Sequence, residues 1–156
     1  MAEQPGRADA DGLQVRASRD GAVIREFRLN QGSVGAWGTS LLLLHTIGAR
    51  SGRAHVTPVT SIAIGDGAWF ISASKAGARR NPAWYHNVLA HPDVVVEVPD
   101  RGAVRVRAFE LSGRDRDEAW ARFLAMSPRF GGYEAGTARL IPVFRLVALD
   151  TVTAIA

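Results

Sequence analysis

The sequence predicts an α+β protein built on an antiparallel β-barrel. Six short segments have the composition of β-strands and are mostly joined by tight turns. Two helical segments lie among them without forming a regular βαβ series, which argues against a doubly wound fold. The length of 156 residues and the apolar content of 47% suit one domain with a substantial hydrophobic core.

The N-terminal region divides into a polar leader and a helix. Residues 1–19 are rich in Asp, Arg, Ala and Gly without periodicity, so we expect a flexible leader before a single domain over 20–156. The segment 20–30 is predicted to be a helix, and Gly32 is placed to end it. Its apolar residues at helical spacing are Val23, Ile24 and Phe27.

The predicted strands are recognised by β-branched or alternating apolar residues with turn residues between them. They cover residues 40–46, 56–64, 68–73, 94–98, 103–111 and 142–152. The sequence Gly65-Asp66-Gly67 is a hairpin signal between the second and third of these strands.

Each predicted helix after the first strands begins at a capping residue. Asn81 is expected to be an N-cap with Pro82 at the first helical position, in a helix that extends to about residue 90. The second helix, over 112–126, opens with Ser112 and then places its apolar residues on one side.

The positive charge is concentrated in one part of the chain. The formal net charge is +4, and the window 48–82 carries all of this excess because it holds five basic residues and one acid. This points to a local anion site and argues against a nucleic-acid-coating surface. The five are Arg50, Arg53, the single lysine Lys75, Arg79 and Arg80, against Asp66.

The sequence lacks the residues and motifs that several classes of enzyme require. There is no cysteine, and the four histidines show no paired spacing with carboxylates, so no metal site is predicted. The chain has no nucleophile elbow, P-loop or Rossmann fingerprint, so an enzyme of this sequence would need an organic cofactor.

The longest apolar run, Leu41 to Leu44, is far shorter than the ~20 residues of a membrane span. No signal peptide opens the sequence, and we expect a cytoplasmic protein.

Two loops combine glycines with cations. The segment 46–58 joins two strands through glycines, two arginines and a histidine; it is either an anion site or a hairpin with solvated arginines. The segment 72–82 places Lys75 and two arginines just before a helix start, where either an anion or solvent would balance them.

These segments resemble the deazaflavin (coenzyme F420)-dependent nitroreductase family. The resemblance covers about residues 22–147 and rests on a Gly-x-Arg-Ser-Gly turn at 48–52, a Ser-Lys pair at 74–75 and an Asn-Pro-x-Trp-Tyr-x-Asn run at 81–87. It implies a six-stranded antiparallel split β-barrel with flanking helices, similar to the FMN-binding split barrels. It also implies coenzyme F420 as the cofactor, whose phosphate and polyglutamate tail would match the basic window.

The resemblance implies contacts to the cofactor from four stretches of the chain. These are Arg50, Ser51 and Gly52 in the first turn; His55, Val56, Thr57 and Pro58 beneath the deazaflavin ring; Ser74 and Lys75 in the second loop; and Ala83, Trp84, Tyr85 and Asn87 at the helix start.

The implied reaction is hydride transfer from reduced F420 to an electron-poor quinone, enone or nitro compound. Family members line the acceptor side with tyrosines, whereas this chain has Thr60, Ser127, Phe130 and Tyr133 at the corresponding places. Tyr133 alone keeps a phenol there, so it is our candidate for the catalytic proton donor or a substrate contact; the alternative is a tyrosine that caps the barrel.

Two other functions remain open from the sequence. The protein could be a non-catalytic binder of a deazaflavin or a lipid-like ligand, or a split-barrel oxidoreductase that uses FMN, which is the less favoured cofactor. In each case the expected partner is a small molecule, without nucleic acid or a stable membrane span, and the protein is expected to be a monomer or homodimer.

Overall fold

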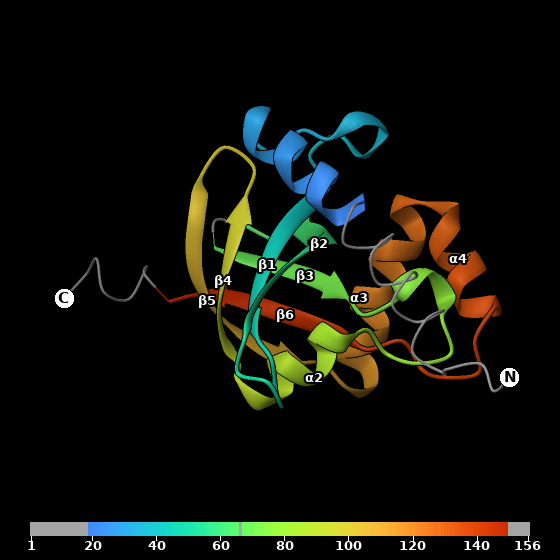
Figure 1. The fold of residues 1–156 in the computed structure, drawn as a ribbon. Coiled ribbons are helices and arrows are strands. Elements are labelled where there is room, and N and C mark those ends of the chain that lie inside the picture. Colours follow the sequence, from blue (N-terminus) through green and yellow to red (C-terminus); the bar gives the residue numbers. More distant parts are fainter. Residues whose placement is uncertain (1–18, 66, 150–156) are drawn as a thin grey trace, which may run out of the picture.

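A closed barrel of six antiparallel strands forms the centre of the molecule (Figure 1). The structure is a computed structural model, and it describes residues 19–65 and 67–149. Around the barrel the strands follow the order β1-β2-β3-β6-β5-β4, and every neighbouring pair is antiparallel. The strands are β1 (Leu41–Ile47), β2 (Ala54–Ala63), β3 (Ala68–Ser72), β4 (Asp93–Val98), β5 (Gly102–Glu110) and β6 (Val143–Ala148). The predicted six-stranded α+β barrel is confirmed.

Helices cover the barrel from several sides. The N-terminal helix, residues 19–29, packs on the outside of β1, and α2 (Ala83–Ala90) contacts the same strand. The helices α3 (Gly113–Met126) and α4 (Pro128–Ala135) lie together on another side, coloured orange in Figure 1. None of the helices within the described residues is long and apolar enough to cross a bilayer.

The apolar run in β1 is explained by burial on both of its faces. Leu42 and Leu44 point into the barrel core, whereas Leu41 and Leu43 point outward under the N-terminal helix and Phe27. Successive side chains of a strand alternate between the two faces of a sheet. A strand that is covered on both faces therefore reads as a continuous apolar run.

An aromatic cluster fixes α3 and α4 against each other. Phe123 and Phe130 are fully buried with ring centroids 5.3 Å apart, and Trp120 and Tyr133 each pack edge-on against Phe130. Such edge-to-face pairs add directional preference to the burial of apolar area. The indole N–H of Trp120 also donates to Glu134.

Some predicted boundaries were wrong for identifiable reasons. The N-cap of α2 is Pro82, not Asn81, because the Asn81 Oδ1 accepts a hydrogen bond from Arg139. The helix α4 was not predicted at all. The last strand ends at Ala148, and residues 150–152 of its predicted range lie outside the described residues. The predicted leader also lies outside them, except for Arg19, which begins the N-terminal helix.

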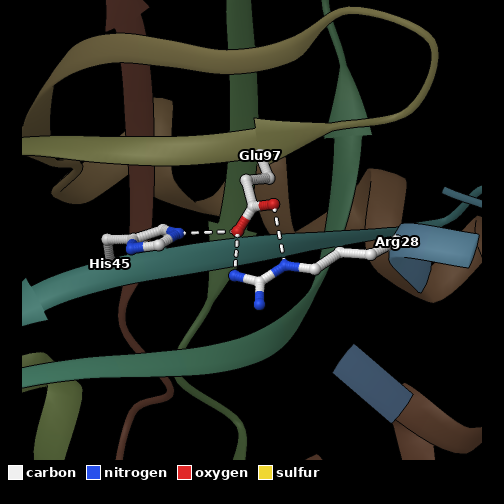
Figure 2. Close-up of polar contacts among 3 residues, drawn as sticks. All are labelled: Arg28, His45 and Glu97. Atoms are coloured by element: carbon white, nitrogen blue, oxygen red, sulfur yellow. Dashed lines mark hydrogen bonds and ion pairs between the residues drawn. The ribbon is translucent and has the colours of Figure 1, made fainter. Parts of the chain in front are cut away.

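An ion network fastens the N-terminal helix to the barrel, as Figure 2 shows. Arg28 donates from Nε and Nη2 to the two carboxylate oxygens of Glu97, at 3.1 and 2.8 Å. His45 Nε2 lies 2.7 Å from Glu97 Oε2. The hydrogen bond from Arg28 holds the pKa of Glu97 below its usual value. Because His45 pairs with Val56 across β1 and β2, the network reaches the strand where cofactor contacts are predicted.

Candidate functional site

The turn between β1 and β2 is closed by glycines and by a side chain from α2. Gly48 donates to the carbonyl of Arg53 at 2.8 Å and accepts from the amide of Gly52 at 2.9 Å. The Asn87 Oδ1 accepts from the amide of Ala49 at 2.9 Å. The buried Asn87 therefore braces the turn that carries Arg50, so its amide side chain is already engaged within the protein.

Gly48 is required because two predicted cofactor residues crowd over it. A Cβ atom at this position would lie 2.3 Å from Ser51 Oγ and 3.3 Å from His55 Nε2. The structure thus brings Ser51 and His55 to the same end of the hairpin. Both residues are exposed, as are Arg50 and Gly52.

The strand β2 changes its pairing partner half-way along its length. Residues 54–60 pair with β1, and Ser61 to Ala63 pair with β3. The amide of Ser61 donates to Ser40 in the β1 direction, so by alternation the backbone groups of Val56 and Pro58 point the other way. Proline has no N–H and is tolerated at such an open edge. This edge offers backbone partners to a ligand.

The second predicted cofactor loop has an unusual backbone. Ser74 is in the right-handed region, whereas Lys75, Ala76 and Gly77 have φ values of 43°, 52° and 78°. A right-handed residue followed by a left-handed one turns successive N–H groups toward one point, which forms a concave anion site. The turn η2 (Lys75–Gly77) therefore fits the phosphate side of an anionic cofactor. Left-handed φ at two non-glycine residues is costly, and surrounding contacts must maintain it.

Arg139 supplies those contacts, and no local pattern in the sequence predicts this role. Its guanidinium donates to the carbonyl oxygens of Ala78, Ala73 and Ser74 at 2.9, 3.1 and 2.9 Å, and to Asn81 Oδ1 at 2.7 Å. Burial lowers the pKa of Arg139 from its ordinary value. One half-buried side chain therefore holds both ends of the loop.

Three of the four predicted acceptor residues line one cleft of about 290 Å³. The cleft lies between the segment before β1 and the start of α4. Its walls include Trp37, Thr60, Met126, Ser127, Arg129 and Phe130. Trp37 and Arg129 were not among the predicted site residues.

Tyr133 lies beside the cleft and does not line it. Its ring packs against Phe130, with centroids 5.6 Å apart. Its backbone abuts η2 so closely that a Cβ on Gly77 would lie 2.9 Å from the Tyr133 carbonyl oxygen. Tyr133 therefore joins the cleft wall to the second cofactor loop.

The remaining predicted residues of α2 have mainly structural partners. Trp84 is buried in the barrel core, 5.8 Å from the ring of Phe144. The hydroxyl of Tyr85 donates to Glu110 Oε2 at 2.8 Å. Burial, helped by this hydrogen bond, raises the pKa of Tyr85 to about 12. Ala83 is exposed.

Comparison with known proteins identifies the family. The model of the F420H(2)-dependent quinone reductases matches residues 20–148. The chain belongs to the F420H(2)-dependent quinone reductase family. A member of that name, Rv1261c of Mycobacterium tuberculosis, is 38% identical over 104 residues, which are 65% of this chain and 69% of the relative.

Solved structures agree with the F420H(2)-dependent quinone reductase assignment. An F420-H2-dependent reductase, FDR-A, has a TM-score of 0.62 and 34% identity over 69% of this chain and 93% of its own. A second structure, described as a domain-swapped dimer, has a TM-score of 0.64 and 30% identity over 88% of this chain and 98% of its own.

The F420H(2)-dependent quinone reductase family confirms the F420 resemblance, the deazaflavin cofactor and the oxidoreductase class. Its name specifies a quinone, whereas the nitroreductase name and the cytoplasmic location stay predictions. The roles of individual site residues also stay predictions.

Proposed function

We propose that this protein binds reduced coenzyme F420 and transfers a hydride from it to a quinone. The outer face of β2 carries the proposal. Val56, Pro58 and Thr60 lie on this face at every second residue, beside the open strand edge at one end and the cleft at the other. The step from Pro58 to Thr60 spans ~7 Å, so a flat ring and an acceptor fit as neighbours along the strand.

Two basic turns suit the anionic end of the cofactor. Exposed Arg50 lies on the turn before β2, and exposed Lys75 lies on the left-handed turn after β3. Cations and converging backbone amides are the usual partners of phosphates and carboxylates. Arg139 would act indirectly, by holding the loop in its anion-binding shape.

The chain's own groups position the cofactor and the acceptor, and one of them supplies a proton. When bound, the reduced deazaflavin supplies the hydride. The backbone of Val56 and Pro58 would orient the ring, and the apolar walls of the cleft would exclude water from the acceptor. The hydroxyl of Tyr133, whose ring packs against the lining residue Phe130, is proposed to return a proton to the reduced acceptor.

Absorbance measurements on the purified protein test this function. Mixed with reduced F420 and a panel of quinones, the protein should accelerate the return of oxidised-cofactor absorbance over a protein-free control. Tight F420 binding without any acceleration would contradict the proposed activity and favour a carrier. The alternative cofactor is examined by parallel equilibrium titrations, in which a preference for FMN over F420 would contradict the cofactor proposal.

A further inference from the structure

A cation–π pair bridges the two walls of the cleft. The guanidinium carbon of Arg129, in the first turn of α4, lies 4.3 Å from the ring centroid of Trp37, at the end of the short helix η1 (Gly35–Trp37). Both residues line the cleft, and Trp37 is 38% exposed. Among the residues that the structure describes, no carboxylate lies within ion-pair distance of Arg129.

Stacking on an indole orients an arginine without using its hydrogen-bond donors. The attraction acts through the ring face, so the N–H groups along the edge of the guanidinium remain available to a ligand. A carboxylate partner would instead neutralise the charge. Arg129 is therefore a positioned positive charge at the wall of a cleft that otherwise contains hydroxyl and apolar side chains.

The size of the cleft limits what can enter. About 290 Å³ is at the lower end of the ~300–1,000 Å³ that small-molecule sites usually have. Phe130 and Met126 offer apolar contact to a flat ring, and Thr60 and Ser127 offer hydroxyls at its edge. These features favour a planar acceptor of one or two rings.

We propose that Arg129, held against Trp37, is the residue that stabilises the negative charge formed on the acceptor oxygen. The inference rests on the proposed F420-dependent activity. The quinone gains the hydrogen and the electron pair of the broken deazaflavin C–H bond, so the cofactor is oxidised and the quinone becomes a hydroquinone monoanion. That anion then gains a proton from the proposed donor or from water, and the proton that the cofactor loses on oxidation goes to water.

Kinetics of two variants and a matched control test this role. In Arg129→Met, kcat for the neutral 2-methyl-1,4-naphthoquinone should fall about 10- to 100-fold, less than in an enclosed oxyanion hole because Arg129 is exposed. KM should change little, since the interaction forms only as charge develops. The kcat of Arg129→Lys should lie between those of the wild type and Arg129→Met, because lysine keeps the charge but loses the planar fork of the guanidinium. Arg114→Met removes an exposed arginine of α3 that pairs with Glu118, and it should leave kcat unchanged.

A second acceptor separates charge stabilisation from simple packing. The anion of 2-hydroxy-1,4-naphthoquinone is already charged in the ground state, so Arg129→Met should raise its KM as well as lower its kcat. Thermal unfolding and F420 titration should give wild-type values for both Arg129 variants.

The outcomes distinguish this inference from the proposed function. If the wild-type protein turns over no quinone, the F420-dependent activity itself is wrong. If the wild type is active and Arg129→Met retains wild-type kcat, the role of Arg129 is wrong while the activity stands. Weakened F420 binding in Arg129→Met would also overturn the inference, because it would assign Arg129 to the cofactor.

Discussion

Arg139 Nη2 donates to the carbonyl oxygen of Ser74 at 2.9 Å, although 65 positions separate the two residues in the sequence. The same guanidinium reaches across the loop to Asn81. The shape of the loop that holds Lys75 is therefore determined by a side chain just before β6. The chemistry expected of the loop depends on this distant anchor.

Replacement of Arg139 by methionine should weaken both the fold and the binding of F420. Three carbonyl oxygens and the Asn81 amide lose a charged donor, so we expect a loss of about 2 to 4 kcal/mol in the free energy of unfolding. The cofactor Kd should rise by at least about tenfold, because the left-handed turn relaxes. Compared with Arg139→Met, Arg139→Lys should recover part of the lost stability. It should recover less of the lost affinity for the cofactor. An unchanged Kd in a titration of the folded Arg139→Met protein would contradict the loop-holding role.

Lys75→Ala should weaken F420 binding by about tenfold at low salt. The substitution removes a cation from the turn whose amides are expected to receive the anionic end of the cofactor. Salt screens such attractions, so the difference between variant and wild type should shrink as ionic strength rises. Fluorescence titrations at two salt concentrations measure this, with Arg114→Ala as the charge-matched control. A loss that is the same at both concentrations would contradict an electrostatic role.

Glu97→Gln should weaken the attachment of the N-terminal helix to the barrel in a pH-dependent way. The pKa of Glu97 is lowered in the folded protein, chiefly by Arg28, so its stabilising contribution is present above its ordinary pKa and is lost as the pH falls through the lower folded value. We expect a cost of about 1 kcal/mol at neutral pH, because Arg28 is half exposed.

Chemical denaturation between pH 7 and pH 3 measures the effect. The gap between wild type and Glu97→Gln should close below the ordinary pKa of a glutamate. A gap that widens toward acid would show that the network stabilises the protein in another way.

Tyr85 should ionise unusually late. The chain has two tyrosines, so a Tyr133→Phe variant reports on Tyr85 alone. The pKa of Tyr85 is raised to about 12 by burial and by the hydrogen bond to Glu110. The contribution of this hydrogen bond to stability is therefore complete below pH ~10, the ordinary pKa of tyrosine, and is lost as the pH rises through the pKa of the folded protein. Ultraviolet titration should show tyrosinate near pH 12, and the late step should be absent in Tyr85→Phe. Complete ionisation of the Tyr133→Phe protein near pH 10 would rule out this environment.

Local patterns in the sequence were sufficient to predict the barrel. The strands β4 and β5 stand out as β-branched or alternating segments, and the Asn-Pro pair marks the start of α2 to within one residue. The basic window also led to the turn before β2 and to the loop after β3, because charge is visible in a sequence without knowledge of the fold.

The helix α4 could not be predicted because its helicity comes from packing. Its eight residues include Gly131 and Gly132, which disfavour a helix, and its conformation depends on the burial of Phe130 against α3. Without α4, the sequence could not show that Arg129 faces Trp37.

The anchor Arg139 was missed for a similar reason. A chain with 18 arginines gives no local sign of the one that binds backbone carbonyls more than 50 residues away. Asn81 illustrates the consequence, since its side chain suits a helix cap by local rules but serves Arg139 instead.

The single lysine makes the cofactor loop chemically addressable. The chain has no cysteine, and Lys75 is its one side chain with a primary amine, exposed on the turn η2. Acylation there would cancel the positive charge. Apart from the α-amino group at the start of the chain, a reagent applied with and without ligand would add its mass only at Lys75 in molecules whose loop is open. Intact-mass spectrometry could then count loaded and empty molecules in one preparation, without any optical signal from the cofactor.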